Sequence, residues 1–330
     1  MKKSCSLGID VGSVSTNLVL LDERFGVLQK LYLRTGGRPI EAIVKGLKMI
    51  ADAVGDTAEI TACGTTGSGR QLADVIAGAD VIKNEITAHA AASCRMVPEV
   101  RTILEIGGQD SKIIFIREGG VSDFAMNTVC AAGTGSFLDR QAARLEIPIE
   151  ELGGYALRAQ CPVRIAGRCA VFAESDMISK QQAGHSAEDI VAGLCEALVR
   201  NYLNNLAKNR VIEGPVMFQG GVAANAGIVA AFEKALGKKI IIPQYYDVMG
   251  AYGAALLAAE RIAQTGEPTR FRGLTGLRTD YAAKSFECEG CSNLCEVVQI
   301  CSGGEVVANW GDRCGKWGAQ IQKEANIKQG

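Results

Sequence analysis

Two stretches of the chain share the same order of apolar strand, polar tip and second apolar strand. The first starts at residues 7–13 (LGIDVGS) and continues into the apolar run 18–21. The second starts at residues 103–109 (ILEIGGQ) and continues into the apolar run 113–116. Each pattern predicts a β-hairpin with a polar tip. The repetition indicates two related lobes, each opening with its own phosphate-binding loop.

Helical periodicity fills the segments between these hairpins. Apolar residues recur at helical spacing from Ile40 to Val54, behind Pro39, which suits a first helical position. Further along, Ser186 and Asp189 resemble a capping box ahead of another apolar helix. Strands that alternate with helices predict an α/β protein.

The pattern divides the chain into four parts. We expect a first lobe over residues 1–100, to which residues 247–263 return, and a second lobe over residues 101–246. Residues 264–285 are rich in Gly, Pro, Thr and Arg without periodicity, which predicts a linker. Residues 286–330 form a cysteine-rich tail, which we expect to be a separate small unit.

Composition narrows the class of protein. Of the 330 residues, 48% are hydrophobic and 22% charged, a balance typical of soluble globular proteins. A formal net charge of -1 gives no electrostatic reason to expect nucleic acid or an anionic membrane as partner. Asp10 interrupts the N-terminal apolar run before a signal-peptide core can form, and no apolar run is long enough to span a bilayer. We therefore expect a cytoplasmic protein.

Twelve cysteines need an explanation that suits that compartment. A disulfide framework is disfavoured in a large chain with no export signal, so metal or iron–sulfur ligation is the better prediction for cysteines that cluster. The chain has only two histidines, His89 and His185, which gives little support to imidazole-rich zinc catalysis. We expect both histidines to be structural or solvated.

The polar tips of the two hairpins carry chemistry that suits a triphosphate. Small residues let backbone N–H groups approach phosphate oxygens, and Asp10 can hold Mg²⁺ directly or through water. In the second tip, Gln109 can position a water for attack on the γ-phosphate, and Asp110 can order Mg²⁺ or that water. The other candidate nucleotide contacts in the tips are Gly12, Ser13, Val14, Ser15, Thr16, Asn17, Glu105, Gly107 and Gly108.

Two further glycine motifs extend this prediction. In residues 218–225 (FQGGVAAN), Gly220 and Gly221 follow a predicted strand, and bare glycines there let an adenine ring lie flat against the backbone. We expect Val222 and Asn225 to take part. Residues 250–255 (GAYGAA) are small enough for close helix approach at an interlobe hinge. Each motif alone is common in structural roles, but the four in this order indicate a nucleotide cleft.

Taken together, these motifs resemble the acetate and sugar kinase, chaperone and actin superfamily. Within it, the chain is most similar to activators of 2-hydroxyacyl-CoA dehydratases and ATPase subunits of benzoyl-CoA reductases. The similarity covers roughly residues 4–262 and is most specific at residues 127–139 (NTVCAAGTGSFLD) and 169–175 (CAVFAES). The resemblance implies two ribonuclease H-like lobes that bind ATP or ADP in the cleft between them. We expect further nucleotide contacts from Gly133, Thr134 and Gly135.

The resemblance also implies that Cys130 and Cys169 bind half of a 4Fe-4S cluster, which the same pair from a second subunit completes. A cubane takes four thiolates, and an isologous homodimer brings two pairs to one axis. A helix-compatible segment follows each cysteine, so helix N-termini can point at the anionic cluster. The alternative is that both cysteines are buried small hydrophobes.

Two features depart from the family pattern. Asn17 stands where some activators carry a lysine, and Glu105 replaces a more usual aspartate. The tail is the larger departure, since it supplies a separate set of thiolates within one small segment. Such a set suits Zn²⁺ first and a second iron–sulfur cluster next, with an unmetallated tail as the alternative. The candidate ligands are Cys288, Cys291, Cys295 and Cys314, with Cys301 as a fifth.

These expectations combine into an ATP-dependent one-electron donor. The resemblance implies an iron–sulfur acceptor: a 2-hydroxyacyl-CoA dehydratase, a benzoyl-CoA reductase or a double-cubane reductase. Reduced ferredoxin or flavodoxin would supply the electron, as in anaerobic metabolism. One rival is a small-molecule kinase of the same fold, which gives Cys130 and Cys169 no role. Another is a chaperone-like ATPase whose cysteines hold zinc.

Overall fold

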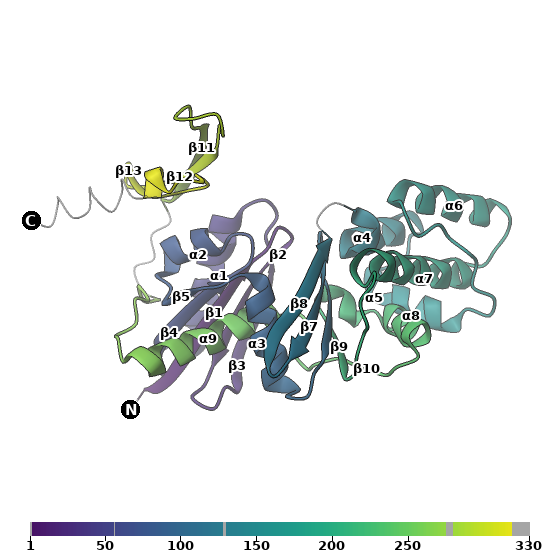
Figure 1. The fold of residues 1–330 in the computed structure, drawn as a ribbon, viewed down its shortest axis with the longest axis horizontal. Helices are drawn as coiled ribbons and strands as arrows, with labels where there is room; N and C mark the ends of the chain where they lie inside the picture. Colours follow the sequence, from purple (N-terminus) through teal and green to yellow (C-terminus); the bar gives the residue numbers. More distant parts are fainter. Residues whose placement is uncertain (1, 56, 128–129, 275–279, 319–330) are drawn as a thin grey trace, which may run out of the picture.

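The computed structural model describes residues 2–55, 57–127, 130–274 and 280–318. Two five-stranded mixed sheets lie next to each other, each with helices packed on it, and a three-stranded antiparallel sheet follows near the C-terminal end (Figure 1). The α/β class expected from the alternating pattern is confirmed.

The first sheet contains the first predicted hairpin. Its order is β3-β2-β1-β4-β5, with β1 antiparallel to β2 and parallel to β4. The hairpin places Asp10 opposite Asn17 at its tip. The strands are β1 (Lys3–Val11), β2 (Ser15–Leu21), β3 (Val27–Arg34), β4 (Ala58–Thr66) and β5 (Val81–Ile82).

The second sheet repeats this arrangement with the second hairpin. Its order is β10-β9-β6-β7-β8, with the central β6 antiparallel to β7 and parallel to β9. Both lobes therefore have the ribonuclease H-like order, in which a central strand pairs with its hairpin partner on one side and a later strand on the other. The strands are β6 (Thr102–Ile106), β7 (Ser111–Arg117), β8 (Gly120–Asn127), β9 (Val216–Gln219) and β10 (Ile240–Ile241).

Two helices confirm their sequence signals. The helix predicted behind Pro39 spans Pro39–Val54, and the Ser186 side chain accepts a hydrogen bond from the Asp189 backbone N–H over 3.2 Å. The helices are α1 (Pro39–Val54), α2 (Arg70–Ala77), α3 (Glu85–Met96), α4 (Gly135–Arg144), α5 (Ile149–Arg158), α6 (Ala170–Gln182), α7 (Ala187–Leu206), α8 (Ala226–Leu236) and α9 (Met249–Thr265). Two short 3₁₀ turns, η1 (Ala131–Gly133) and η2 (Gly221–Ala224), precede α4 and α8.

Helix α9 packs closely on the first lobe through small residues. A Cβ added at Gly8 of β1 would lie 1.8 Å from the Ala251 carbonyl oxygen, and one at Gly253 would lie 1.9 Å from that of Ala88 in α3. These contacts confirm the close helix approach predicted from residues 250–255. Because β1 carries Asp10 at its end, the same packing fixes the base of the first tip.

A shared apolar core joins the two lobes. It includes Val19 from β2, Ala90 from α3 and Ala251 from α9, together with Ile114 and Met217 from the second sheet. We call it the interlobe core. In Figure 1, α3 lies where the two sheets meet, and its residue Ala90 is part of this core.

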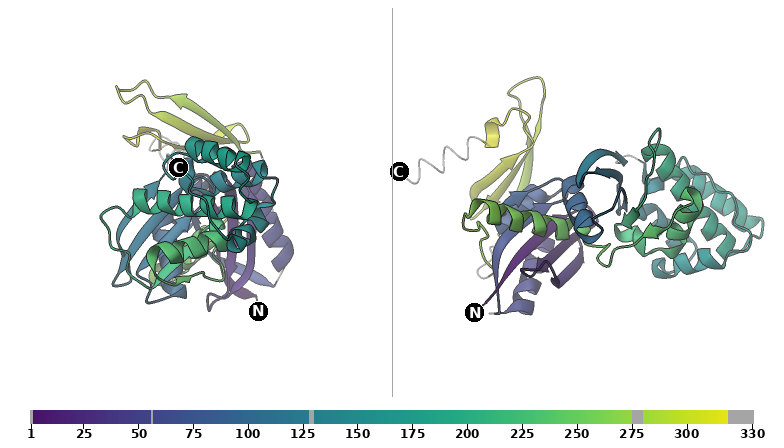
Figure 2. Two further views of the ribbon diagram at one scale, coloured as in Figure 1. Left: turned by 90° about the vertical axis from the view of Figure 1, so that its right-hand side faces the viewer. Right: turned by 60° about the horizontal axis from the view of Figure 1, so that its bottom comes forward.

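The chain after α9 is held against the first lobe. The carboxylate of Asp80 accepts hydrogen bonds from the Thr269 hydroxyl over 2.8 Å and from the Arg270 backbone N–H over 2.6 Å. Part of the predicted linker 264–285 is therefore anchored, while residues 275–279 lie outside the described residues. The third sheet (Figure 2) begins within that linker and contains β11 (Ala282–Glu287), β12 (Glu296–Ser302) and β13 (Glu305–Trp310).

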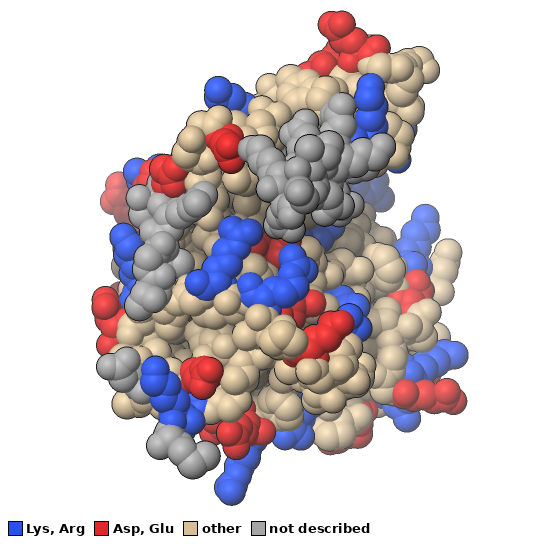
Figure 3. Space-filling view, turned by 90° about the vertical axis from the view of Figure 1, so that its left-hand side faces the viewer, with Lys and Arg blue, Asp and Glu red and all other residues tan. Residues whose placement is uncertain are grey.

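The charged side chains of the first-lobe end are mixed in sign. On the face shown in Figure 3, lysines and arginines are interspersed with aspartates and glutamates, and neither sign forms a continuous field. Over the described ranges, no helix combines the length and the apolar character needed to cross a bilayer.

Candidate functional site

The two hairpin tips face each other across a cavity of about 300 Å³. They approach so closely that a Cβ added at Gly108 would lie 2.5 Å from Cγ2 of Val14. The structure thus brings together residues predicted from segments that lie far apart in the sequence. Those that line the cavity are Asp10, Gly12, Ser13, Val14, Ser15, Asn17, Glu105, Gly107, Gly108, Gln109, Asp110, Gly220 and Gly221.

A second cavity of about 310 Å³ shares part of this lining and extends toward α4 and α8. It has Gly221 and Gly108 in common with the first cavity and adds Gly135, Val222 and Asn225. The two adjoining spaces offer one place for phosphates between the tips and another for a nucleoside beside Gly221.

Three predicted contacts line neither cavity. The Thr16 hydroxyl is buried and hydrogen-bonded to that of Thr35 over 3.0 Å, because its strand position turns it away from the cleft. Gly133 packs where a Cβ would lie 2.8 Å from Oδ1 of Asn201, and the Thr134 hydroxyl donates to the Ala131 carbonyl. These residues shape the hairpin and the η1 turn instead of facing the cleft.

The backbone closes both tips in the same way. The Gly12 N–H donates to the Ser15 carbonyl over 2.8 Å, and the Gly107 N–H donates to the Asp110 carbonyl over 3.0 Å. The first turn of α4 also grips the second tip: the Gly135 N–H donates to the Gly107 carbonyl over 2.9 Å, and the Ser136 N–H to that of Gly108 over 2.8 Å. The tip therefore cannot move without acting on α4.

Lys112 is a site residue to which the sequence reading gave no role. Its side chain is 2% exposed, and Nζ lies 2.7 Å from Glu85 Oε2, 2.9 Å from Asp110 Oδ1 and 3.1 Å from Glu105 Oε2. Glu85 begins α3 against the first lobe, whereas Lys112 belongs to β7, so the ion pair connects the lobes at the cavity. Its only sequence signal was a lysine inside the second hairpin motif.

The carboxylates around Lys112 outnumber the cations. Burial raises the pKa of Glu105 to about 8, and burial together with the charge of Glu85 raises that of Asp10 to about 7, with Lys112 opposing both shifts. Burial also acts to raise the pKa of Glu85, but Lys112 outweighs it and the pKa is lowered. Burial disfavours the Lys112 ammonium, yet the three carboxylates raise its pKa. Excess buried carboxylate oxygen is the donor set that suits Mg²⁺.

A substitution at Gly250 tests the role of Asp10 in ATP hydrolysis. A Cβ at this position would lie 2.2 Å from Asp10 Oδ2, so Gly250→Ala should displace that carboxylate and lower kcat for ATP about tenfold or more, as expected when a metal-orienting group moves. Steady-state ATP hydrolysis measures this. Gly154→Ala in α5 is the matched control, because its Cβ would meet only Arg158 Nη1 at 3.5 Å and the change should stabilise the helix by about 0.5–1 kcal/mol. A Gly250→Ala enzyme with the wild-type kcat would contradict the role of Asp10.

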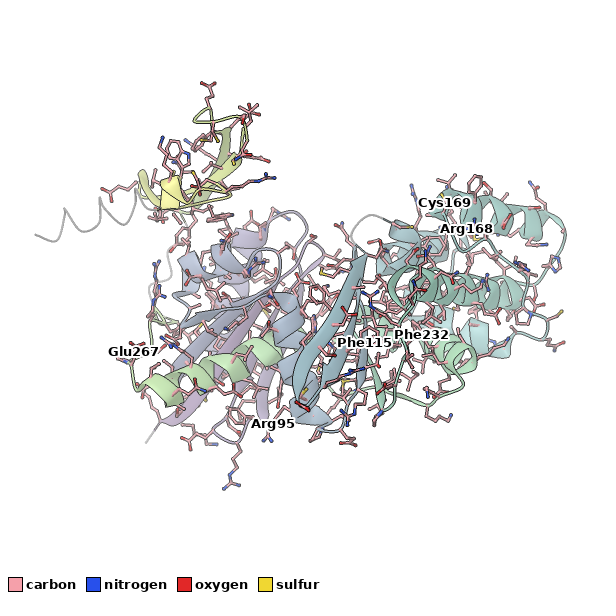
Figure 4. The ribbon with its side chains drawn as sticks, in the orientation of Figure 1. Arg95, Phe115, Arg168, Cys169, Phe232 and Glu267 are labelled. Atoms are coloured by element: carbon pink, nitrogen blue, oxygen red, sulfur yellow. The ribbon has the colours of Figure 1, made fainter. Side chains whose placement is uncertain are left out.

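Cys130 and Cys169 come together at the start of two helical segments. Cys169 directly precedes α6, and Cys130 directly precedes η1. Sγ of Cys130 lies 3.7 Å from the carbonyl oxygen of Arg168, next to Cys169, and Asn201 Nδ2 lies 3.9 Å from the same sulfur. Figure 4 shows Arg168 and Cys169 at the start of α6. Both cysteines are partly exposed, which does not fit buried small hydrophobes. Residues 128–129 of this motif lie outside the described residues.

The tail cysteines are close in sequence but do not converge. The Cys288 N–H donates to the Cys295 carbonyl over 2.8 Å within the β11–β12 loop, which also carries Cys291, while Cys314 follows β13. Cys301 lies in β12. Across the described part of the chain, no three His, Cys, Asp or Glu residues are grouped as a metal site. Metal binding by the tail thus stays a prediction.

His89 is buried and lines the cavity beside Glu85 and Lys112. Of the two environments expected for it, structural or solvated, burial leaves the structural one. Its partner is Gln219, whose Nε2 lies 2.9 Å from His89 Nδ1. Because the two residues are 130 positions apart, no sequence pattern predicts their hydrogen bond.

Comparison with known proteins identifies relatives of this chain. The 2-hydroxyisocaproyl-CoA dehydratase activator of Clostridioides difficile is 33% identical over 264 residues, which is 79% of this chain and 97% of the relative. The (R)-2-hydroxyglutaryl-CoA dehydratase activating ATPase of Acidaminococcus fermentans is 34% identical over 265 residues, 78% of this chain and 98% of the relative.

A solved structure shares the fold as well as the sequence. It is the activator of the 2-hydroxyisocaproyl-CoA dehydratase from Clostridium difficile with bound ADPNP, which matches with a TM-score of 0.72 and 33% identity over 79% of this chain and 97% of that chain. The model of the BadF/BadG/BcrA/BcrD ATPase family matches residues 7–258, so the cysteine-rich tail lies beyond it. With the repeated lobes and the paired phosphate tips, these matches show that the chain belongs to the BadF/BadG/BcrA/BcrD ATPase family.

Proposed function

We propose that this chain is an ATP-driven one-electron donor whose homodimer holds a 4Fe-4S cluster between Cys130 and Cys169 of both copies. The observation that carries the proposal is the pair of hydrogen bonds from Gly135 and Ser136 to the second tip. They connect the phosphate end of the cleft to the start of α4, and η1 and Cys130 lie directly before it.

The cysteine pair fits half of a cluster. Sγ of Cys130 lies beside the peptide that joins Arg168 to Cys169, and each cysteine precedes a helical turn whose backbone N–H groups favour negative charge. Asn201 holds both segments, since its amide donates to the Gly167 carbonyl over 2.6 Å and also approaches Cys130. When bound, the cluster would supply a one-electron couple at low potential.

A second copy is needed to complete four thiolates, and the surface beside Cys169 suits one. Val171 and Phe172 on the first turn of α6 are 68% and 67% exposed. Two large apolar side chains exposed on neighbouring residues form a patch of the kind that marks an interaction site. A two-fold axis near this turn would cover them and bring both cysteine pairs together.

The cleft residues have different roles in the proposed hydrolysis of ATP. Asp10 and Asp110 would hold Mg²⁺, which neutralises charge on the β- and γ-phosphates when bound. Gln109 would orient the attacking water, while Ser13 and Gly108, which line the cavity at the two tips, would offer backbone N–H groups to the phosphate oxygens. Loss of the γ-phosphate removes contacts from the second tip, and the tip's hydrogen bonds pass this shift to α4 and Cys130.

The relatives point to the class of partner. Their names describe activation of 2-hydroxyacyl-CoA dehydratases. We propose an iron–sulfur acceptor of this kind, a benzoyl-CoA reductase or a double-cubane reductase, with reduced ferredoxin or flavodoxin as the electron source. A small-molecule kinase of the same superfamily is the rival function.

Anaerobic purification of the full chain tests the proposal. We expect a brown dimer with about four irons at the shared site, and ATP hydrolysis that needs no phosphoryl acceptor. A colourless protein that hydrolyses ATP only when a small-molecule acceptor is added would support the kinase instead.

The tail carries a separate prediction. Cys288, Cys291, Cys295 and Cys314 should bind one Zn²⁺ per chain, because a closed thiolate site would stabilise a small sheet with little core of its own. Replacing Cys291 by Ser in the full chain should remove about one zinc and leave the shared-site iron unchanged, as measured by elemental analysis. Loss of about four irons per chain would instead indicate a second cluster. Unchanged zinc and iron would mean that the tail thiols are free.

A further inference from the structure

A buried hydrogen-bond network of side chains connects α3 to the second sheet beside the nucleotide cavity. Ser93 Oγ donates to Gln219 Oε1 over 3.0 Å, and Gln219 Nε2 lies 2.9 Å from His89 Nδ1. Ser93 and Gln219 are fully buried, and His89 is 6% exposed. Ser93 and His89 belong to α3, whereas Gln219 ends β9. The network therefore exists only while α3 and β9 keep their relative position.

The hydrogen-bond network of Ser93, Gln219 and His89 fixes the tautomer of His89. Because Gln219 Oε1 accepts from the Ser93 hydroxyl, the amide end that faces Nδ1 is the N–H donor. Nδ1 then accepts, and the neutral ring carries its proton on Nε2. Burial lowers the pKa of His89 to about 4, Lys112 adds to this effect and Glu85 opposes it, so the ring is uncharged near neutral pH.

The position of His89 lets its Nε2–H donate a hydrogen bond into the nucleotide cavity. His89 lines the cavity that we assign to the phosphates, together with Asp10, Glu85 and Lys112. It follows Glu85 by one helical turn, so both side chains lie on the same side of α3. Since Gln219 occupies Nδ1, the Nε2–H is the ring group left to face the cavity.

We infer that His89 donates its Nε2–H to the terminal phosphate of bound ATP, and that Gln219 and Ser93 are positioning residues that hold this tautomer. An uncharged donor suits the site, because it can stabilise developing negative charge without repelling Lys112 or a bound cation. The inference rests on ATP hydrolysis alone, so it stands or falls independently of the proposed cluster.

Replacing His89 tests the donor. His89→Ala should lower kcat/KM for ATP about 100-fold, the usual loss when one preorganised donor is removed, with ADP affinity within about threefold of wild type. His89→Gln keeps an N–H at similar reach and should retain more kcat than His89→Ala. The exposed His185→Ala is the control and should match wild type. Wild-type kcat/KM in His89→Ala, or equal kcat in His89→Ala and His89→Gln, would overturn the donor role.

Gln219→Glu tests the positioning role through pH. A carboxylate cannot donate to Nδ1, so it draws the proton there and raises the pKa of His89 above its wild-type value. Below the new pKa the imidazolium still donates from Nε2, and above it Nε2 presents a lone pair to the phosphate. Lys112 from β7 and Glu85 from α3 also face His89, and both stay charged near neutral pH.

The ratio of Gln219→Glu kcat to wild-type kcat should therefore fall about tenfold or more as pH rises from about 6 to 8. Taking the ratio cancels the titration of Asp10, which both proteins share, whereas Glu105 pairs with residue 219 across β6 and β9 and is expected to respond to the new carboxylate. Gln264→Glu, an exposed change on α9, should give a constant ratio near one. A Gln219→Glu ratio that does not change with pH would overturn the tautomer assignment.

Discussion

Serine in place of Cys130 or Cys169 is expected to remove about four irons per dimer and to abolish ATP-dependent electron transfer, while ADP still binds. Each chain supplies only two thiolates to the proposed site, so one substitution removes two of four ligands from the dimer. Iron analysis, visible absorption and ADP titration of anaerobically purified protein measure the three quantities.

The matched control for this prediction is Cys161→Ser. Cys161 is exposed and lies on the loop between α5 and α6, eight residues before Cys169. This variant should keep full iron and full absorbance. A Cys130→Ser protein that retains the shared-site absorbance would exclude Cys130 as a ligand.

Lys112→Met is expected to cost about 3–5 kcal/mol of unfolding free energy, the usual loss when one partner of a buried ion pair is removed. It leaves Glu85, Glu105 and Asp110 around a buried position with no cation. Urea denaturation of the nucleotide-free protein measures the loss. Lys48→Met, an exposed change on α1, should change stability by less than about 0.5 kcal/mol.

The loss in Lys112→Met should also depend on pH. Without the ammonium, burial and mutual repulsion raise the pKa values of the remaining carboxyls above those of the unfolded chain. Such groups favour the folded state only while protonated, so the loss should grow as pH rises from about 5 to 8. A loss below about 1 kcal/mol across this range would show that the carboxylates do not depend on Lys112.

The sequence predicted the architecture well because its signals are local. A hairpin shows in a few alternating residues, and α1 shows in Pro39 and the helical spacing behind it. The internal repeat then gave the relation between the lobes, which the identical strand orders confirm. It also placed Asp10, Gln109 and Asp110 at tips that meet at one cavity.

The residues missed in the site are those defined by contacts between distant segments. Glu85 and Lys112 are 27 positions apart, and His89 and Gln219 are 130 apart, so no spacing rule links them. Thr16 lines neither cavity, which its motif could not show, because a motif gives the order of neighbours and not which side chains point toward the cleft. In the tail, the spacing of the cysteines suggested a metal site, but the described loop holds them by backbone hydrogen bonds without grouping them.

The most direct test of the account is a single-turnover experiment on the reduced dimer. The anaerobic protein is mixed in a stopped-flow instrument with a 2-hydroxyacyl-CoA dehydratase as acceptor, with MgATP or with MgADP, and cluster absorbance is followed. We expect rapid one-electron oxidation with MgATP and none with MgADP, because in the proposed mechanism hydrolysis would move the second tip and, through α4, Cys130. Oxidation at the same rate with both nucleotides would contradict it.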